Sequence, residues 1–498
     1  MSIPLLFGLL ALTLGVVGDE TPEAQSPQSA CASLQSLLGA TIVQTPAAGS
    51  SFQTIVGTPL NLANNELTPS CVVIPQNTSH VSTAMKAIYK TKSRYAVLAG
   101  GHSAMKGWNA VRDGVLIYFR DMKAVSYDSR KDTITMQPGV RWGEAVNTLA
   151  PLGVAPVGGR AAHVGSGFLL GGGISFLSPS LGYGADLYKE LDVVLVDGSV
   201  VTATANNKYS DLFRALKGGA NRFGIVTRYE LYPFHSGKQS DKTWFGGTIT
   251  YPGSFVEDVL RATARYTKNV DDPNATIFVT LEHIVNAPAN KIDTVVQANI
   301  FYHGKSLPPK IFGDFLSIPA SNKSLSALSY ADIVANTFPA NDDHGSTYLY
   351  GASTRRGGDE KAFVDALNFN LNFTESLKRD LAWTALTFTP IPDSQIKAGR
   401  ARGGNAIDAP LTGGYAVMQI MQTLPVGVVD VPPAVANGKK KLLSQIKPVP
   451  GLPLFINECD ALQNVFATYG GYDFLKKTYK KYDPTRFNIG HTDGPIGL

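Results

Sequence analysis

Short apolar runs and amphipathic segments alternate along the first half of the chain. Runs of apolar residues bounded by turn residues predict strands, and apolar residues spaced three and four apart predict helices. We therefore expect strands at 72–74, 95–99, 115–119, 133–137, 191–196, 200–203 and 223–231, and helices at 81–89, 140–149 and 210–216. Asp197-Gly198 separates two of these strands and predicts a tight hairpin. The pattern indicates an α+β domain with mixed sheets over residues 67–236.

A second pattern begins after a turn-rich stretch at residues 232–237, which we interpret as a linker. Beyond it, strands at 246–251, 276–282, 294–302 and 385–389 alternate with helices at 255–266 and 360–369. This predicts a second α+β domain, with its own sheet, over residues 237–450. Residues 451–498 form a C-terminal segment, with an apolar strand at 453–457 and a helix at 472–482. Residues 19–66 form an N-terminal segment that precedes both domains.

The N-terminus carries an apolar run from Pro4 to Gly18 that ends just before Asp19. The run is too short to span a bilayer, and a polar, proline-containing stretch follows it, as after a signal peptide. No basic residue precedes the apolar run, as one usually does in a signal peptide, so a buried N-terminal helix is the alternative. We expect residues 1–18 to be a signal peptide and the protein to be secreted or held in a secretory compartment. No other stretch is apolar for long enough to suggest a membrane span.

The number and positions of the cysteines are consistent with a secreted protein. Cys31 and Cys71 lie near the expected mature N-terminus, where they can close a loop of about 40 residues. Cys459 follows an apolar run and is expected to be a buried thiol. Four Asn-X-Ser/Thr sequons offer glycosylation sites in a secretory pathway: Asn77, Asn274, Asn322 and Asn372.

Composition and charge exclude several classes of protein. The 498 residues are 44% hydrophobic and 17% charged, which argues against a disordered chain or a coiled coil. The net charge of +5 is small for this length, and no basic patch is interleaved with aromatic residues, so nucleic-acid binding is not expected. The eight histidines are scattered, and neither an H-E-x-x-H motif nor a cysteine cluster is present, so no metal site is expected.

Two glycine-rich loops are the remaining features of the sequence that indicate a binding site. The first, residues 100–103 (GGHS), directly follows a predicted strand, where glycines let backbone N–H groups converge on an anion such as a diphosphate. The second, residues 164–174, is rich enough in glycine to lie close to a flat ligand. Its spacing does not fit G-x-G-x-x-G, which argues against a Rossmann dinucleotide site. Each loop by itself is also compatible with a plain tight turn.

Four motifs follow one another around these loops. They are R-x-x-V-x-x-GGHS at 94–103, G-V-L-I-x-x-R-x-M at 114–122, P-x-G-G-R-x-x-x-V-G-x-G-x-x-x-GGG at 156–173 and D-L-F-x-A-L-x-GG-x-x-x-FGIVT at 211–227. This order resembles the berberine bridge enzyme-like flavoproteins of the vanillyl-alcohol-oxidase (PCMH-type) FAD-binding family, and most of all their secreted fungal branch. Residues 455–460 resemble the family's Y-x-N-Y segment, and 482–484 its closing Y-D/N-P. The resemblance implies a two-domain PCMH-type FAD-binding fold of the α+β class, with a separate antiparallel-sheet substrate domain.

The resemblance also implies how the cofactor is held. FAD would extend across the first domain with its diphosphate over the loop that ends at Ser103. One covalent bond would join a ring nitrogen of His102 to the C8 methyl of the isoalloxazine; a turn histidine beside noncovalent FAD is the alternative. The other residues implied to contact the cofactor are Ala99, Gly100, Gly101, Ser103, Gly165, Gly172, Gly173, Ile225, Val226 and Asn457.

The chain departs from the family pattern at three positions. Ala161 stands where many members carry a cysteine for a second covalent link, so a two-point attachment is excluded. Leu98 stands where an arginine or lysine often precedes the first loop, which leaves less cationic support for the diphosphate. Glu458 replaces the second tyrosine of Y-x-N-Y, which often serves in the family as the base for alcohol oxidation.

A glutamate at position 458 suits proton transfer. At the end of an apolar strand, burial raises the pKa of a carboxyl group and can poise it near neutral pH. We expect Glu458 to act at the flavin face; a structural, hydrogen-bonding carboxylate is the alternative. Tyr183 and His163 border the second glycine loop and are interpreted as packing or substrate-wall residues. Glu282 and His283 lie on a predicted strand of the second domain, and the sequence does not decide which of them faces the cleft.

These features predict a secreted, monomeric FAD-linked oxidoreductase. We expect Glu458 to withdraw a proton while hydride passes to flavin N5, and dioxygen to reoxidise the flavin. The expected substrate is a small organic molecule of fungal secondary metabolism, and a carbohydrate oxidase is an alternative. A redox-neutral isomerase or cyclase that uses Glu458 as acid and base is a second alternative. A secreted glycan-binding or flavin-storage protein that retains only the fold is a third.

Overall fold

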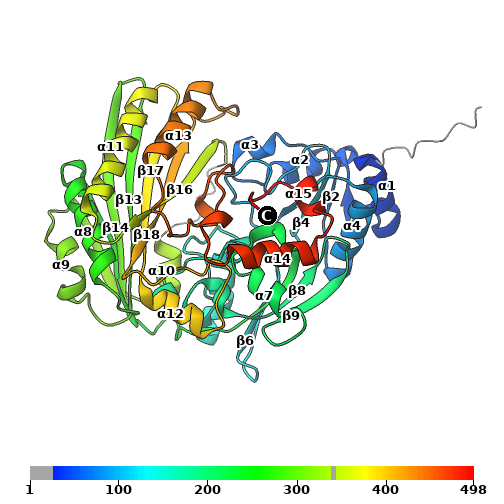
Figure 1. Ribbon diagram of the computed structural model, residues 1–498, viewed down its shortest axis with the longest axis horizontal. Helices are drawn as coiled ribbons and strands as arrows, with labels where there is room; N and C mark the ends of the chain where they lie inside the picture. The colour runs from blue at the N-terminus through cyan, green and yellow to red at the C-terminus, as the bar shows by residue number, and fades with distance from the viewer. Residues whose placement is uncertain (1–25, 338–343) are drawn as a thin grey trace, which may run out of the picture.

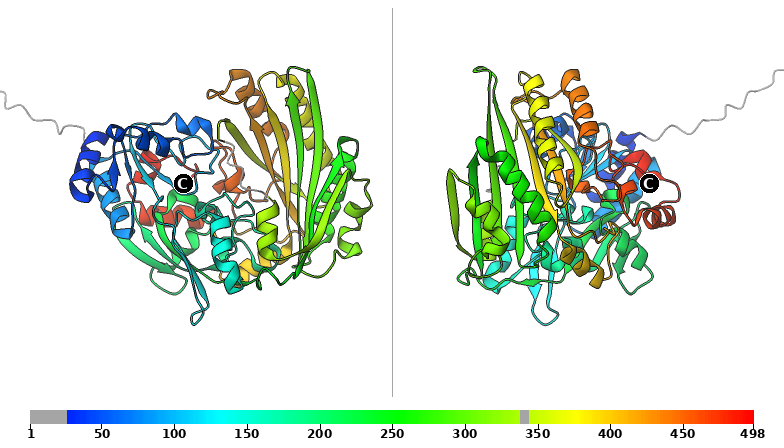
Figure 2. Two further views of the ribbon diagram at one scale, coloured as in Figure 1. Left: turned by 180° about the vertical axis from the view of Figure 1, so that it is seen from behind. Right: turned by 60° about the vertical axis from the view of Figure 1, so that its left-hand side comes forward.

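The computed structural model describes residues 26–337 and 344–498, so the predicted signal peptide at 1–18 lies outside the described residues. The N-terminal half and the last residues of the chain occupy one side of the molecule, and the large sheet occupies the other (Figure 1). Seen from behind, the same two parts lie side by side (Figure 2, left). Within the described part of the chain, no helix has the length and apolar character needed to cross a membrane.

The first part is built on two small sheets. In the first sheet, β2, β4 and β3 are parallel and β1 is antiparallel at the edge; the second sheet is antiparallel throughout. The first has the order β1 (Val43–Gln44), β2 (Cys71–Val73), β4 (Val115–Tyr118), β3 (Tyr95–Leu98), and the second the order β5 (Val125–Asp128), β6 (Thr133–Met136), β10 (Ile225–Leu231), β8 (Tyr188–Val194), β9 (Val200–Thr204). Asp197 and Gly198 turn the chain between β8 and β9, as the sequence predicted.

The second part is dominated by one antiparallel sheet of seven strands. Its order is β15 (Asn322–Leu328), β12 (Trp244–Pro252), β14 (Lys291–Tyr302), β13 (Ala275–Asn286), β17 (Trp383–Ile391), β18 (Tyr415–Thr423), β16 (Tyr348–Arg356). Successive side chains of each strand alternate between the two faces. Val279, Leu281 and Leu386 pack on the face covered by the helices α8 (Val256–Asn269), α9 (Pro309–Ser317), α11 (Glu360–Leu377) and α13 (Pro433–Gln445). Figure 1 shows α8, α9 and α11 on the outer side of the sheet, so the other face turns toward the first part.

Helices surround the two small sheets and join the ends of the chain to them. They are α1 (Pro27–Leu38), α2 (Ser50–Val56), α3 (Leu62–Asn65), α4 (Thr78–Thr91), α5 (Trp142–Leu149), α6 (Ser178–Leu181), α7 (Ser210–Ala215), α14 (Tyr472–Tyr482) and α15 (Phe487–His491). Asn77 begins α4 by accepting a hydrogen bond from the His80 backbone N–H. Tyr482 of α14 donates a hydrogen bond of 2.7 Å to Asp211 of α7, so the end of the chain packs against the first part.

A disulfide ties the N-terminal segment to the first sheet. Cys31 of α1 is bonded to Cys71 of β2, which closes the loop that the sequence predicted. Cys459 is a buried free thiol. Of the four sequon asparagines, Asn77, Asn322 and Asn372 are exposed and Asn274 is half-buried.

Several elements differ from the sequence prediction. The strand expected at 453–457 is absent, and a short 3-10 helix, η7 (Ile456–Glu458), follows an extended segment without a sheet partner. The expected linker contains β11 (Phe234–His235), which pairs with β7 (Val154–Ala155). The strands β15, β16 and β18 and the helices α10 (Tyr330–Thr337), α12 (Asp393–Ala401) and α13 were not predicted. Pairing partners distant in sequence stabilise those strands, and their local pattern alone does not reveal such partners.

Candidate active site

A cavity of about 570 Å³ opens between the two small sheets and the large sheet. Its volume lies in the range of pockets that hold cofactors and drug-sized ligands, about 300–1,000 Å³. Both glycine loops, the start of β10, the helix η7 and the inner face of the large sheet contribute to its walls. The cavity therefore joins residues of the four motifs and of the segment 455–460, whereas the closing motif at 482–484 lies outside its lining.

The two glycine loops meet backbone to backbone. A Cβ placed on Gly100 or on Gly165 would lie 2.6 Å from the Cα of the other, a distance that real Cβ atoms do not adopt. The Arg141 side chain donates a hydrogen bond of 3.2 Å to the Gly100 carbonyl, and the Arg141 backbone pairs with Gly165. Gly101 adopts a φ of 80°, which favours glycine in the turn that follows. Together the loops form a wall of bare backbone that a flat or anionic ligand can approach closely.

Most of the predicted cofactor residues line this cavity: Ala99, Gly100, Gly101, His102, Ser103, Gly165, Ile225, Val226 and Asn457. Gly172 and Gly173 lie outside this lining, and their contact with the cofactor stays a prediction. Both have a positive φ, 102° and 77°, and they turn the chain behind the wall, where Gly172 packs against Ile407. Gly171, one residue earlier, lines the cavity in their place.

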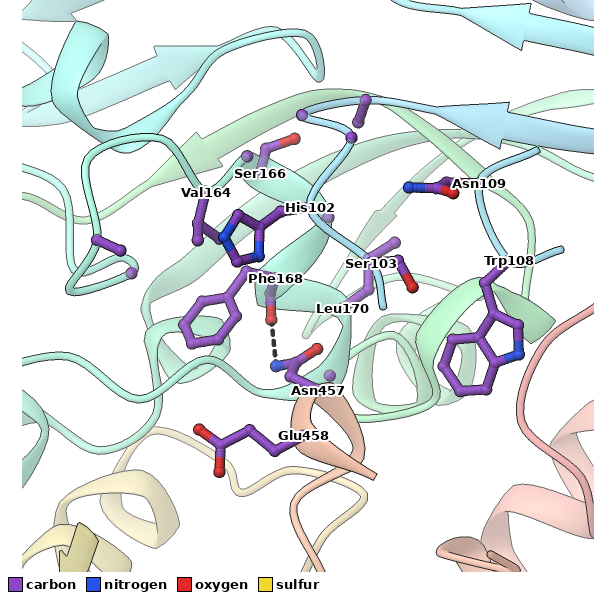
Figure 3. Close-up of a pocket in the computed structure, with 18 of the residues that line it drawn as sticks. His102, Ser103, Trp108, Asn109, Val164, Ser166, Phe168, Leu170, Asn457 and Glu458 are labelled. Carbon is purple, nitrogen blue, oxygen red and sulfur yellow. Dashed lines mark hydrogen bonds between the residues drawn. The ribbon is translucent and has the colours of Figure 1, made fainter. Parts of the chain in front are cut away.

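His102 lies on the cavity wall beside a second histidine. Its Nε2 lies 2.7 Å from Nε2 of His163, so one imidazole donates a hydrogen bond and the other accepts it. The two ring centroids are 4.6 Å apart. Figure 3 shows His102 on the same wall as Val164 and Phe168, with Asn457 and Glu458 below them in the view. The contact restricts both the rotation of the His102 ring and the position of its proton.

Asn457 connects the helix η7 to the second glycine loop. Its Nδ2 donates a hydrogen bond of 2.9 Å to the Phe168 carbonyl, drawn as a dashed line in Figure 3. A Cβ on Gly171 would collide with the same amide, so glycine is needed where Asn457 packs. Asn457 thus holds the next residue, Glu458, at a defined place on the cavity wall.

Glu458 is a buried carboxyl group beside a buried arginine. Its side chain is 11% exposed, and its Oε1 lies 3.9 Å from Nη2 of Arg160. Burial raises the pKa of Glu458 to about 7, although the positive charge of Arg160 opposes that rise. The strand expected before Glu458 is absent, but the apolar surroundings that the sequence indicated are present. A carboxyl group with this pKa can accept or donate a proton near neutral pH.

The other titratable residues that the sequence singled out differ in whether they face the cavity. Glu282 of β13 lines the cavity, and burial raises the pKa of its carboxyl group. His283 points to the opposite face, where it is buried, contacts Thr294 and has a pKa lowered to about 4 by desolvation. Tyr183 lies outside the cavity lining; it is buried in the core, where burial raises its pKa to about 12. His163 lines the cavity.

Sequence reasoning missed the polar face of the large sheet and several residues of the first part. The missed lining residues include Trp108, Asn109, Arg160, Phe168, Thr280, Gln297, Asn299, Tyr350, Trp383, Thr387, Gln419 and Met421. Alternation along each strand placed Thr280 and Glu282 on one face, but only the packing of the sheet decides which face meets the cavity. Arg160 stood in the P-x-G-G-R motif and offered the clearest available signal.

Comparisons with known proteins point to flavin enzymes. The FAD binding domain family matches residues 69–204. An FAD-linked oxidoreductase from Arthroderma benhamiae is 31% identical over 366 residues, which span 71% of this chain and 70% of that protein. An FAD-dependent monooxygenase from Arthrobotrys oligospora is 30% identical over 443 residues, 84% of this chain and 80% of that protein.

Two solved structures share the fold. Carbohydrate oxidase from Microdochium nivale, in complex with a substrate analogue, superposes with a TM-score of 0.75 at 19% identity, and covers 94% of this chain and 100% of that one. A variant of berberine bridge enzyme in complex with (S)-reticuline superposes with a TM-score of 0.72 at 14% identity, and covers 94% of this chain and 99% of that one.

The cavity residues fit a flavin nucleotide. Ser103 Oγ and both polar side-chain atoms of Asn109 are buried and have no hydrogen-bond partner among the described residues. Buried polar atoms are normally hydrogen-bonded, so these atoms indicate a polar ligand in the cavity. The backbone wall at Gly100 and Gly165 suits the close approach of a diphosphate or a flat ring.

Proposed function

The chain belongs to the berberine bridge enzyme-like family of FAD-linked oxidoreductases, and on that premise we propose that it is an oxidase of a small organic molecule of fungal secondary metabolism. Glu458 is the proposed base. The main observation in support is that its buried carboxyl group, with a pKa raised to about 7, lies in the same cavity as His102. When bound, the flavin supplies a two-electron acceptor that returns its electrons to dioxygen as hydrogen peroxide.

The cofactor is proposed to be joined covalently to the protein through a ring nitrogen of His102. The position of His102 at the cavity wall and its contact with His163 support this attachment, since they restrict the orientation of the ring. Ala161 also lines the cavity and offers no thiol, so the attachment has a single point. The disulfide between Cys31 and Cys71 supports the further proposal that the protein is secreted, because disulfides persist in oxidising compartments.

Residues of the chain bind the cofactor, transfer the proton and contact the substrate. The backbone around Gly100 and Gly165 binds and orients the cofactor, and Asn457 holds η7 against the second loop. Glu458 accepts the hydroxyl proton of the substrate through its carboxylate, and Arg160 stabilises the charge of that carboxylate. The inner face of the large sheet carries the hydroxyl and amide groups proposed to contact the substrate.

Peroxide release tests this function. The purified protein is screened with small aromatic and aliphatic alcohols and hydroxy acids for substrate-dependent peroxide formation. Wild-type turnover is expected to rise as the pH increases through about 7, because the base must be deprotonated. Glu458→Gln is expected to lower turnover about a hundredfold to ten-thousandfold while the flavin content stays unchanged.

The exposed carboxyl Glu257 on α8 supplies the control, and Glu257→Gln is expected to retain full turnover. Product formed without peroxide would replace the oxidase with a redox-neutral isomerase or cyclase. Full turnover in Glu458→Gln would remove Glu458 from the reaction.

A further inference from the structure

Arg160 carries a permanent positive charge into the cavity. Its side chain is only 11% exposed. The guanidinium carbon lies 4.7 Å from the ring centroid of Phe278, and Nη1 donates a hydrogen bond of 3.0 Å to the Thr389 hydroxyl. Phe278 and Thr389 belong to β13 and β17 of the large sheet, and they share the face of Thr280 and the cavity. The second part of the molecule therefore fixes the guanidinium at the substrate side.

Most of the hydrogen-bond donors of Arg160 have no acceptor among residues 26–337 and 344–498. A guanidinium has five N–H donors and stays charged at any pH at which proteins fold. Within the described chain, Thr389 accepts one hydrogen bond, and the paired carboxylate oxygen of Glu458 lies 3.9 Å away, beyond hydrogen-bond distance. Buried charged groups are costly unless they are hydrogen-bonded. The remaining N–H groups of Arg160 therefore suit an acceptor supplied by a molecule in the cavity.

Glu458 neutralises this charge only in part. With a pKa raised to about 7, its carboxyl group is protonated in a large fraction of the molecules at neutral pH. Glu282, the other carboxyl on the wall, also has a pKa raised by burial. The cavity therefore keeps a positive charge at Arg160 that its own carboxyl groups do not cancel.

We propose that Arg160 binds an acidic oxygen of the substrate, so that the enzyme acts on organic anions that carry a carboxylate, phenolate or enolate group. This inference rests on the proposed oxidoreductase function and names its substrate class. The forked N–H groups of a guanidinium match a planar oxyanion in geometry and in charge. An anion held at Arg160 brings the neighbouring atoms of the substrate next to Glu458, 3.9 Å away.

The surrounding wall supports a substrate that is uncharged apart from this group. Thr280 and Thr387, whose hydroxyls lie 3.1 Å apart, and the amide of Gln419 offer neutral hydrogen-bond partners. Trp383 and Tyr350 offer aromatic surface. These residues suit the hydroxyls, carbonyls and rings of the rest of the substrate.

Calorimetric titration of the purified holoenzyme tests the anion site without turnover. Benzoate is compared with benzamide, a neutral molecule of the same shape, and 4-nitrophenolate with 4-nitroanisole, so that the two pairs distinguish carboxylate from phenolate binding. The anion of at least one pair is expected to bind about tenfold more tightly than its neutral partner, the effect of one charge-assisted hydrogen bond. Arg160→Gln is expected to abolish that preference, and Arg160→Lys to retain part of it.

The control variant is Arg261→Gln, on the helix-covered side of the large sheet, which is expected to keep the full preference. Equal affinity for both members of each pair in the wild type would overturn the proposal. An anion preference that survives in Arg160→Gln would also overturn it. Loss of flavin in Arg160→Gln, measured by the visible absorbance of the purified variant, would overturn it as well, because the guanidinium would then face the cofactor and not the substrate. If Arg160→Gln does not fold, the anion preference of the wild type is compared with that of Arg160→Lys, and an undiminished preference in Arg160→Lys would overturn the proposal. Absence of peroxide with every substrate would overturn the oxidase function alone, because the titration needs no turnover.

Discussion

His102 and His163 are 61 positions apart in sequence and share one hydrogen bond, 2.7 Å between their Nε2 atoms. In a neutral imidazole only one nitrogen carries a proton, so the contact links the tautomers of the two rings. The contact therefore restricts the orientation of the His102 ring at the cavity wall.

Acid precipitation tests the covalent attachment at His102. We expect the yellow colour of the wild-type protein to remain in the washed pellet, because a covalent bond survives unfolding. In His102→Ala the flavin is expected to be absent from the pellet and to appear in the supernatant or be lost during purification. The absorbance of both fractions near the visible flavin maximum measures the distribution.

His235→Ala is the matched control, because the His235 side chain is 64% exposed and lies outside the cavity lining. It is expected to behave as the wild type does. Free flavin in the wild-type supernatant and a colourless pellet would contradict the covalent link while leaving the fold and the FAD site intact.

At the scale of elements, the site depends on the close packing of the loops after β3 and before η3 (Ser166–Gly171). Gly100 and Gly165 touch through their backbones, and neither position leaves space for a Cβ. Gly165 has a φ of −94°, so the requirement for glycine there comes from the facing loop and not from its own backbone conformation. The two loops can therefore act as one wall only while both positions are glycine.

Gly165→Ala is expected to separate the loops and to lower the flavin content of the purified protein. The added methyl group meets backbone atoms that cannot rotate away, so we expect a loss of stability of about 1–3 kcal/mol. Thermal unfolding and the ratio of visible to ultraviolet absorbance measure the two effects.

Gly313→Ala, in α9, is the control, because a Cβ there has no neighbour within 4 Å. It is expected to leave stability and flavin content unchanged or slightly improved, since alanine favours helices. Normal flavin content and stability in Gly165→Ala would show that the loops tolerate separation.

At the scale of the whole molecule, the two parts share a hydrophobic core. One buried cluster contains Trp142 and Leu169 from the first part together with Ile391 and Tyr415 from the second. Buried polar contacts cross the same boundary, where Asn405 donates a hydrogen bond of 3.0 Å to Asp186. The cavity lies at this shared boundary, so its shape depends on both parts at once.

Differential scanning calorimetry is expected to show one cooperative unfolding transition for the purified protein. A core that spans the boundary couples the stability of the two parts, in contrast to domains joined only by a linker. The calorimetric and van't Hoff enthalpies are expected to agree within about a tenth, as a two-state transition requires. Two separated transitions would contradict this coupling.

The sequence by itself determined the family, the first part of the fold and most of the loop residues that line the cavity. Local apolar periodicity and turn residues were enough to predict strands such as β3 and β10 and the hairpin at Asp197-Gly198, although β10 pairs with the distant strand β6. The glycine loops stood in recognisable motifs, and a glutamate at position 458 identified the candidate base. Its burial was deduced from apolar neighbours, although η7 replaced the expected strand.

Only the tertiary structure decided which residues face one another. The pairing of His102 with His163, and of Arg160 with Glu458, joins segments that are far apart in sequence. The same applies to the inner face of the large sheet, where Glu282 turns to the cavity and its neighbour His283 to the helices. Alternation along a strand assigns neighbours to opposite faces, but the packing of distant elements decides which face becomes the site.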